Sequence, residues 1–363
     1  MKSLFQPIRL GGIDSANRFV RSATFECPAD KSNRFLHAIQ PVYNRLAEGG
    51  VGVIITGMMG VDENSRVLPS MIDVRNRNFP EQMRSLCDSV HERGAKIVVQ
   101  LSHCGVRAGC VDGGLPPLGP SDVDLPGGGR SRAMTERQMG ELAGRFAEAA
   151  LLCREAGADG VQMHAAHGYL FSQFLSPLFN KRDDSYGGDV AGRANFLFDV
   201  YAAMRRLAGA DFPLWIKING TDLVEGGLTP DESLRVCGEL SRRGLDAIEV
   251  SGGIGFDAAS RSTQSVRTEA DEGRFVAEAR AIADEVEIPV ISVCGHRRPE
   301  ALRQLLRKTR IAAFSLSRPL ICEPELLRRW HAGAEEGAKC ISCNKCMRPQ
   351  KDLRCVEFNA TAQ

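Results

Sequence analysis

Hydrophobic residues along the 363-residue chain occur in a phrase that recurs. A helical stretch ends in charged residues, one or two glycines follow, and a short run of aliphatic residues comes next. Glycine supplies the left-handed residue that ends a helix. A continuous apolar run is typical of a parallel strand that is covered on both faces. The phrase is found at 47–56, 92–100, 155–164 and 242–251.

Further apolar runs bring the number of predicted strands to eight, and amphipathic stretches that predict helices lie between them. The pattern therefore predicts a (β/α)₈ TIM barrel, a fold of ~250 residues plus insertions. A doubly wound sheet is the rival, but it would normally carry Gly-x-Gly-x-x-Gly after its first strand. The added strands are expected at 19–23, 213–219, 288–294 and 311–316, and the helices near 38–48, 79–93, 135–156, 191–207, 229–243, 271–286, 298–307 and 323–336.

A Gly- and Pro-rich stretch at 108–132 follows the third predicted strand. Loops after strands lie on the C-terminal face of a barrel, so we expect this long loop to line or cover the active site. A surface insertion without function is the alternative. The predicted organisation is a barrel over residues 1–335 followed by a short Cys-rich tail over 336–363.

Composition narrows the class of partner. Lys and Arg number 46 against 45 Asp and Glu, and no long block of like charge occurs, which argues against a nucleic-acid or membrane-surface partner. No run approaches the ~18 apolar residues of a membrane span, and the first residues do not form a secretory signal. Eight cysteines are scattered singly, which suits reduced thiols in a cytoplasmic protein. The oligomeric state stays open, a homo-oligomer included.

Polar side chains gather where the predicted strands end, which is where barrels of this kind place their active sites. His164, His167 and Tyr169 follow the fourth strand and offer two N–H donors for a carbonyl or anionic oxygen and a phenolic proton. Metal binding by the two histidines is the alternative, although no carboxylate lies beside them. Gln100 ends the third strand, and Lys217 in the fifth requires an anionic partner.

The last two predicted strands are followed by Gly295 and by Ser317 and Arg318. Loops after strands 7 and 8 are the usual phosphate site of this fold, and a glycine backbone with an arginine suits that role. Arg21, within the first predicted strand, has no explanation from the sequence.

A longer motif links these residues to a known family. The stretch from His164 to Gly188, with residues 4–7, 17–20 and 100–103, closely resembles the old yellow enzyme family of FMN-dependent ene-reductases. The resemblance covers roughly residues 1–335. It implies FMN across the mouth of a barrel, NAD(P)H as the reductant and a small enone-type substrate. Hydride would pass from NAD(P)H to FMN and then to the β carbon of an α,β-unsaturated carbonyl.

The same resemblance implies a role for individual residues. His164 and His167 would bind the carbonyl oxygen of the substrate, and Tyr169 would protonate its α carbon. Gln100 would bind the pyrimidine edge of the flavin, and Lys217 would lie near its N1–O2 edge. The other implied cofactor residues are Ala23, Thr24 and Gly57 against the ring, and Gly295, Ser317 and Arg318 at the phosphate.

The chain departs from the family pattern in two places. Phe25 stands where the family often has Cys or Thr near flavin O4. The tail carries the spacing C-x₂-C-x₂-C-x₈-C, which is closer to an iron–sulfur run than to the separated pairs of a zinc site. It resembles the cluster motif of the 2,4-dienoyl-CoA reductase-like branch, where the last spacing is wider. A [4Fe–4S] cluster, zinc and no metal stay open for Cys340, Cys343, Cys346 and Cys355.

The leading functional prediction is an NAD(P)H-dependent flavin oxidoreductase that reduces activated C=C bonds. A dienoyl-thioester reductase or amine demethylase-like flavoenzyme that uses an Fe–S cluster is a second hypothesis. A non-enzymatic flavin or cluster redox sensor is a third. Tyr169 favours alkene reduction, because demethylation needs no proton donor at an α carbon. The sequence decides neither the substrate nor the choice between NADH and NADPH.

Overall fold

Within the part of the chain that the computed structural model describes, residues 3–26, 35–109, 115–125, 129–346 and 353–358, eight parallel strands close a barrel. β4 pairs with both β3 and β6, and β13 pairs with β3, so the sheet has no open edge between these strands. The predicted (β/α)₈ fold is confirmed, with every predicted strand in place. The barrel strands are β3 (Phe19–Arg21), β4 (Val53–Ile55), β6 (Lys96–Ser102), β9 (Gly160–Ala165), β10 (Leu214–Asn219), β11 (Ala247–Ser251), β12 (Val290–Ser292) and β13 (Ala313–Leu316).

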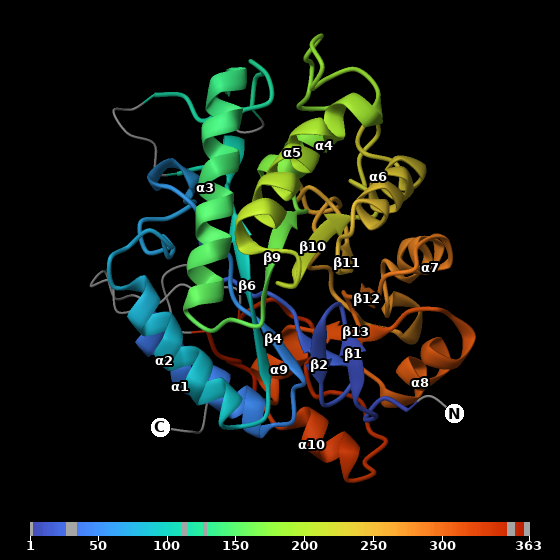
Figure 1. Ribbon diagram of the computed structural model, residues 1–363. Helices are drawn as coiled ribbons and strands as arrows, with labels where there is room; N and C mark the ends of the chain where they lie inside the picture. The colour runs from blue at the N-terminus through green and yellow to red at the C-terminus, as the bar shows by residue number, and fades with distance from the viewer. Residues whose placement is uncertain (1–2, 27–34, 110–114, 126–128, 347–352, 359–363) are drawn as a thin grey trace.

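Helices surround this barrel, as Figure 1 shows. Side-chain caps begin three of them: Thr135 accepts from the backbone N–H of Gln138, Asp189 from that of Gly192, and Thr229 from that of Glu232. Glycines with positive φ end the helix-to-strand phrases, as the sequence predicts. The helices on the outside are α1 (Phe35–Glu48), α2 (Phe79–His91), α3 (Glu136–Glu155), α5 (Val190–Ala208), α6 (Pro230–Arg242), α7 (Val276–Glu285) and α8 (Pro299–Lys308).

Two predicted helices differ from the structure. α7 begins at Val276, later than expected, because residues before it form a short 3₁₀ turn. The helix expected at 323–336 is shorter, at Leu326–His331, and a separate short helix, Arg318–Cys322, precedes it. The smaller elements are β5 (Met59–Gly60), η1 (Glu63–Ser65), η2 (Gly105–Arg107), β7 (Leu118–Gly119), β8 (Arg132–Ala133), α4 (Leu170–Leu175), η4 (Glu269–Asp271), α9 (Arg318–Cys322) and α10 (Leu326–His331).

A hairpin that the sequence analysis did not predict closes the N-terminal end of the barrel. It consists of β1 (Ile8–Leu10) and β2 (Ile13–Ser15), shown in dark blue in Figure 1. Leu10 and Ile13 pack with Trp215 inside the barrel, and the indole N–H donates to the carbonyl of Gly11 at 2.9 Å. Gly11 has φ +51°, and a Cβ there would lie 2.6 Å from the indole nitrogen, so glycine is required. With this end filled, the strand termini at the opposite end of the barrel are left to form a site.

Strand register places polar residues of neighbouring strands at one level inside the barrel. Gln100 of β6 is opposite Gln162 of β9. Lys217 of β10 is opposite His164 of β9 on one side and Glu249 of β11 on the other. Because partners in a parallel ladder share a height along the barrel axis, these side chains form a polar layer above the apolar core.

The long loop after β6 is partly described: β7 and β8 pair in parallel, and 110–114 and 126–128 lie outside the described residues. No helix among the residues that the structure describes is long and apolar enough to cross a membrane. The division into a barrel at 1–335 and a tail at 336–363 stays a prediction.

The structure explains Arg21. Its guanidinium pairs with the carboxylate of Glu26 and donates to the carbonyl of Ile55 at 2.9 Å. The Tyr43 hydroxyl donates to Glu26 at 3.2 Å and accepts from the Gly57 backbone N–H at 3.1 Å. Arg21 and Glu26 are both almost completely buried, so each neutralises a charge that water cannot reach.

We therefore expect Arg21→Met to lower the free energy of unfolding by about 3–5 kcal/mol, because it leaves Glu26 buried without a counter-charge. Urea denaturation measures the change. The exposed pair Arg9–Asp14 is the control, and Arg9→Met should cost no more than about 1 kcal/mol. Equal losses in the two variants would contradict a structural role for the buried pair.

Candidate functional site

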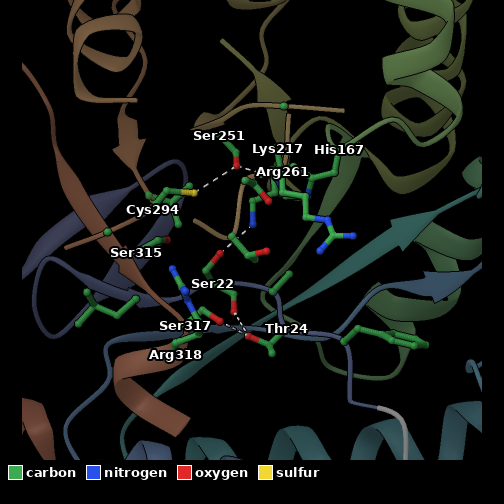
Figure 2. Close-up of a pocket in the computed structure, with 18 of the residues that line it drawn as sticks. Ser22, Thr24, His167, Lys217, Ser251, Arg261, Cys294, Ser315, Ser317 and Arg318 are labelled. Atoms are coloured by element: carbon green, nitrogen blue, oxygen red, sulfur yellow. Dashed lines mark hydrogen bonds between the residues drawn. The ribbon is translucent and has the colours of Figure 1, made fainter. Parts of the chain in front are cut away.

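A cavity of about 320 Å³ opens at the C-terminal end of the barrel. Figure 2 shows part of its wall. Ten of the eleven predicted catalytic and cofactor residues line it, although they come from six different strand ends. They are Ala23, Thr24, Gln100, His164, His167, Tyr169, Lys217, Gly295, Ser317 and Arg318.

Gly57 is the exception, because it lies beside the cavity rather than on its wall. A Cβ at Gly57 would lie 2.4 Å from a carboxylate oxygen of Glu26 and 2.7 Å from the carbonyl of Thr24. Its small size therefore makes room for the buried Arg21–Glu26 pair. Phe25, the residue that departs from the family pattern, does line the cavity.

A chain of buried polar groups forms the floor of the cavity. The Gln100 amide donates to Gln162 at 2.7 Å, and Gln162 donates to Glu249 at 3.0 Å. Lys217 Nζ lies 3.3 Å from Glu249 and donates to the Ser22 hydroxyl at 2.7 Å, and this hydroxyl donates to Glu249 at 2.8 Å. These hydrogen bonds fix the orientation of each of the five side chains, because each has a partner inside the barrel.

Glu249 is the anionic partner that a buried Lys217 requires. Its side chain is 0% exposed and that of Lys217 4%. Ser22, Gln162 and Glu249 were missed by the sequence analysis. A detectable signal was present for Glu249, which is a charged residue in the middle of the apolar strand Ala247–Ser251. Lys217 is thus a compensated cation, and any positive potential it presents to the cavity is reduced by Glu249.

His164, His167 and Tyr169 form a group on one wall of the cavity. The His164 ring centre lies 5.3 Å from that of His167 and 4.8 Å from that of Tyr169. His167 has φ +62°, and its backbone N–H donates to the Asn219 amide oxygen at 3.0 Å. Its Nε2 lies 2.7 Å from the Ser251 hydroxyl. Asn219 and Ser251, which hold this turn, were also missed from the sequence.

Burial sets the protonation states of this group. It lowers the pKa of His164 well below the ordinary value and that of His167 to about 3, and Lys217 acts in the same direction. Burial raises the pKa of Tyr169 to about 12. At neutral pH the two imidazoles are therefore neutral and the phenol keeps its proton. His164 Nδ1 accepts from the Ala166 backbone N–H at 3.4 Å, which places the ring proton on Nε2.

The other end of the cavity has small residues and hydroxyl groups. The Ser317 hydroxyl lies 2.8 Å from that of Thr24, and both appear beside Arg318 in Figure 2. Gly295 has φ +91°, and a Cβ there would lie 3.0 Å from the Gly273 backbone nitrogen. Ser315 Oγ is buried without a hydrogen-bond partner among the described residues, so it is free to donate to a bound anion.

Arg318 has a second set of contacts that the sequence did not indicate. Its guanidinium donates to the Gln264 carbonyl at 3.0 Å, the Asn344 amide oxygen at 2.7 Å and the Ser342 carbonyl at 3.4 Å. Ser342 itself lines the cavity. Arg318 therefore joins the phosphate end of the cavity to the Cys-rich tail.

The four cysteines of the tail also come together. They line a second, small cavity of about 20 Å³ next to Arg318 and Ile321. Cys322 of α9, not predicted as a site residue, packs with Cys340 and Cys355. Ser342 and Asn344 have left-handed φ of +55° and +61°, so the loop curls between the thiols. Among the described residues, however, no group of three or more His, Cys, Asp or Glu side chains is arranged to hold a metal ion.

Comparison with known proteins identifies the family to which the chain belongs. Residues 3–336 match the family described as NADH:flavin oxidoreductase / NADH oxidase. A metal reductase of Desulforamulus reducens is 32% identical over 95% of this chain and 51% of its own length. An NADH oxidase of Thermoanaerobacter brockii is 31% identical over 94% of this chain and 53% of its own. The chain thus spans about half the length of these relatives.

A solved structure, a 2-naphthoyl-CoA reductase in complex with 2-naphthoyl-CoA, shares the fold. Its TM-score is 0.86 at 22% identity, over 97% of this chain and 56% of that one. The resemblance to old yellow enzymes is confirmed at the level of the family: the chain belongs to the NADH:flavin oxidoreductase / NADH oxidase family.

Proposed function

We propose that the chain is an FMN-dependent oxidoreductase that uses NAD(P)H to reduce an alkene conjugated to a carbonyl group. The observation that carries the proposal is the group of two neutral imidazoles and one protonated phenol on a cavity wall, above the polar floor. This group can hold a carbonyl oxygen and supply a proton, which are the two tasks that alkene reduction gives to a protein.

The cavity has the donors that FMN requires. At one end of the cavity, buried hydrogen bonds orient the side chains of Gln100 and Lys217. At the other end, the Ser315 hydroxyl is free to donate. Ser317, Arg318 and the backbone of Gly295 would hold the phosphate. When bound, FMN would accept a hydride from NAD(P)H and deliver it to the β carbon of the substrate.

The two histidines would bind the carbonyl oxygen of the substrate. His164 carries its proton on Nε2, because Nδ1 accepts from the backbone. The contact between His167 and Ser251 holds the second ring. Both rings act as neutral hydrogen-bond donors toward the negative charge that develops on oxygen when hydride is added, and a fixed donor of this kind contributes about 2.7–4 kcal/mol to such a reaction.

Tyr169 would protonate the α carbon. Its pKa, raised to about 12 mainly by burial, keeps the proton on the phenol throughout the neutral range. The guanidinium of Arg107 lies 5.7 Å from the centre of the ring and opposes that shift. A positioned acid of this type typically contributes 10²–10⁴-fold to rate.

The other hypotheses can be weighed against the same geometry. A dienoyl-thioester substrate uses the same carbonyl and proton sites, and the structural neighbour named as a 2-naphthoyl-CoA reductase supports a thioester as a member of the substrate class. Demethylation and a non-enzymatic sensor leave the proton of Tyr169 without a role. Alkene reduction therefore accounts for more of the site.

For the tail we propose a [4Fe–4S] cluster held by Cys340, Cys343, Cys346 and Cys355, which requires the thiols to rearrange because the described side chains are not arranged to hold a metal ion. Support comes from the convergence of these residues on one small cavity whose wall also includes Ile321 and Phe358. Thiolate donors with apolar surroundings suit a cluster. Burial raises the pKa of Cys340 and Cys346, so the thiols are protonated until metal replaces the proton.

Tyr169→Phe should slow the oxidative half-reaction with an enone by about 10²-fold or more, because the proton donor is lost. Stopped-flow absorbance separates this step from flavin reduction by NAD(P)H, where the loss should be small since hydride entry needs no phenolic proton. Tyr186→Phe is the matched control, because that residue does not line the cavity and its hydroxyl donates to Asp199 at 3.0 Å. An equal loss in both half-reactions would contradict the role of Tyr169.

Substitutions in the buried pair should shift the flavin potential in opposite directions. Lys217→Met leaves the Glu249 carboxylate near the flavin and lowers the potential, whereas Glu249→Gln frees the lysine charge and raises it. A change of about 30 mV corresponds to about 1.4 kcal/mol for a two-electron couple. Redox titration of the holoenzyme measures both. Unchanged potentials, or shifts of the same sign, would argue against electrostatic tuning by this pair.

Iron and sulfide analysis of anaerobically purified protein tests the tail. We expect about four irons and four sulfides per chain for a [4Fe–4S] cluster, and loss of both in Cys343→Ser. Cys237→Ala, in α6 and away from the tail, is the control. Fewer than about two irons per chain, or stoichiometric zinc, would rule out the cluster.

A further inference from the structure

The wall of the large cavity is cationic. Arg107, Arg261, Arg297 and Arg318 line it together with Lys217, and no Asp or Glu is among the lining residues. Lys217 has Glu249. None of the four arginines forms an ion pair with a carboxylate within the described part of the chain, whereas the adjacent Arg298 pairs with both Glu269 and Glu272. The cavity therefore presents positive charge that the protein itself does not neutralise.

These arginines form two groups. Arg297 and Arg318 are tied to the loop before α7 and to the tail, through the carbonyls of Val266 and Gln264 and through the tail backbone. Their position next to Gly295 and Ser317 suits the FMN phosphate. A phosphate carries about −1.5 to −2 charges at neutral pH, which these two cations would match.

Arg107 belongs to the other end of the cavity, beside the catalytic group. Its Cζ lies 5.7 Å from the centre of the Tyr169 ring, and it contributes to the low pKa of His167. The guanidinium stacks on Phe256 at 4.2 Å and donates to the Ile254 carbonyl. These contacts hold the Arg107 guanidinium in place. Its Nε is nevertheless buried and has no hydrogen-bond partner among the described residues.

Arg261 lies next to Arg107. A Cβ on Gly255 would contact both side chains, at 3.5 Å from Arg107 Nη2 and 4.0 Å from Arg261 Cγ. Arg261 is exposed. Burial lowers the pKa of Arg107, and the charge of Arg261 acts in the same direction. Figure 2 places Arg261 near His167 and Lys217, away from Ser317 and Arg318. The two side chains thus approach each other at Gly255, and their like charges disfavour each other unless an anion lies between them.

We propose that Arg107 and Arg261 form an anion subsite that binds a carboxylate carried by the alkene substrate, at a distance from the reacting carbons. The substrate would then be an enone- or enal-type molecule with an acidic group at its far end. A guanidinium pair matches a carboxylate in charge and geometry. The inference rests on the proposed function, because it assumes that the reacting carbonyl lies on the histidines.

The test compares two enones that differ only in charge: 4-carboxybenzylideneacetone and its methyl ester. We expect the holoenzyme to favour the carboxylate over the ester in kcat/KM by about tenfold at low salt. In Arg261→Gln this preference should fall to about one, and high salt should reduce it in the wild type because Arg261 is exposed. Arg267→Gln is the matched control, since Arg267 is on the same loop but does not line the cavity.

A binding measurement removes the dependence on turnover. The saturated ketone 4-(4-carboxyphenyl)butan-2-one cannot be reduced at a C=C bond, and calorimetry with the oxidised holoenzyme should show a dissociation constant about tenfold higher in Arg261→Gln than in Arg267→Gln. Equal constants in the two variants would overturn the subsite.

The outcomes separate the two proposals and the two sources of an anion. If both enones are reduced with equal kcat/KM, the anion subsite is wrong and alkene reduction stands. If neither is reduced, the proposed function fails, and the calorimetric comparison alone decides the subsite. If Arg261→Gln slows flavin reduction by NAD(P)H but keeps the preference for the carboxylate, the anion is the dinucleotide pyrophosphate and the proposal is overturned.

Discussion

The ion pair between Lys217 and Glu249 is the constraint on which the site depends. Both side chains are inside the barrel, where an unpaired charge would cost several kcal/mol. The pair joins neighbouring strands β10 and β11, and hydrogen bonds extend it through Gln162 to Gln100 on one side and to Ser22 on the other. A strand shifted by one residue would leave at least one of these groups without a partner. This series of hydrogen-bonded side chains thus holds the register of the barrel strands and orients the donors that face the cavity.

Above this layer, neutral groups occupy one wall of the cavity and cations lie around them. His164 and His167 are neutral and held by backbone or hydroxyl contacts, and Tyr169 keeps its phenolic proton, so in the proposed reaction they would donate without reorganisation. The cations lie around them: Lys217 below, with its charge compensated, and arginines at both ends. An electropositive cavity of this kind attracts anionic ligands and favours the phosphate-bearing cofactors of the family.

Arg318 connects the wall of the cavity to the loop that carries the tail cysteines. It lies on the cavity wall, and it also donates to Ser342 and Asn344 within the cysteine loop. Packing of Cys322 from α9 against Cys340 and Cys355 adds an apolar contact between the same two parts.

Much of the fold and of the site could be predicted from the sequence, because both follow from local patterns. The alternation of amphipathic stretches with apolar runs determined the strands of the barrel, and the position of a residue after a strand determined that it faces the mouth. His164, Tyr169, Gln100 and Lys217 were found in this way, and the motif around His164 identified the family.

Tertiary structure decided which of these groups are neighbours. Glu249 is 32 residues from Lys217 along the sequence, so no local pattern pairs them. Arg21 likewise had no explanation from the sequence until the structure showed its pairing with Glu26. The hairpin that closes the lower end, the position of Arg107 over the Tyr169 ring and the contact between Arg318 and the tail are set by the closure of the barrel. A sequence pattern reports the solvent exposure of each residue in its own element, whereas the pairing of buried charges depends on which strands and loops the closed barrel brings together.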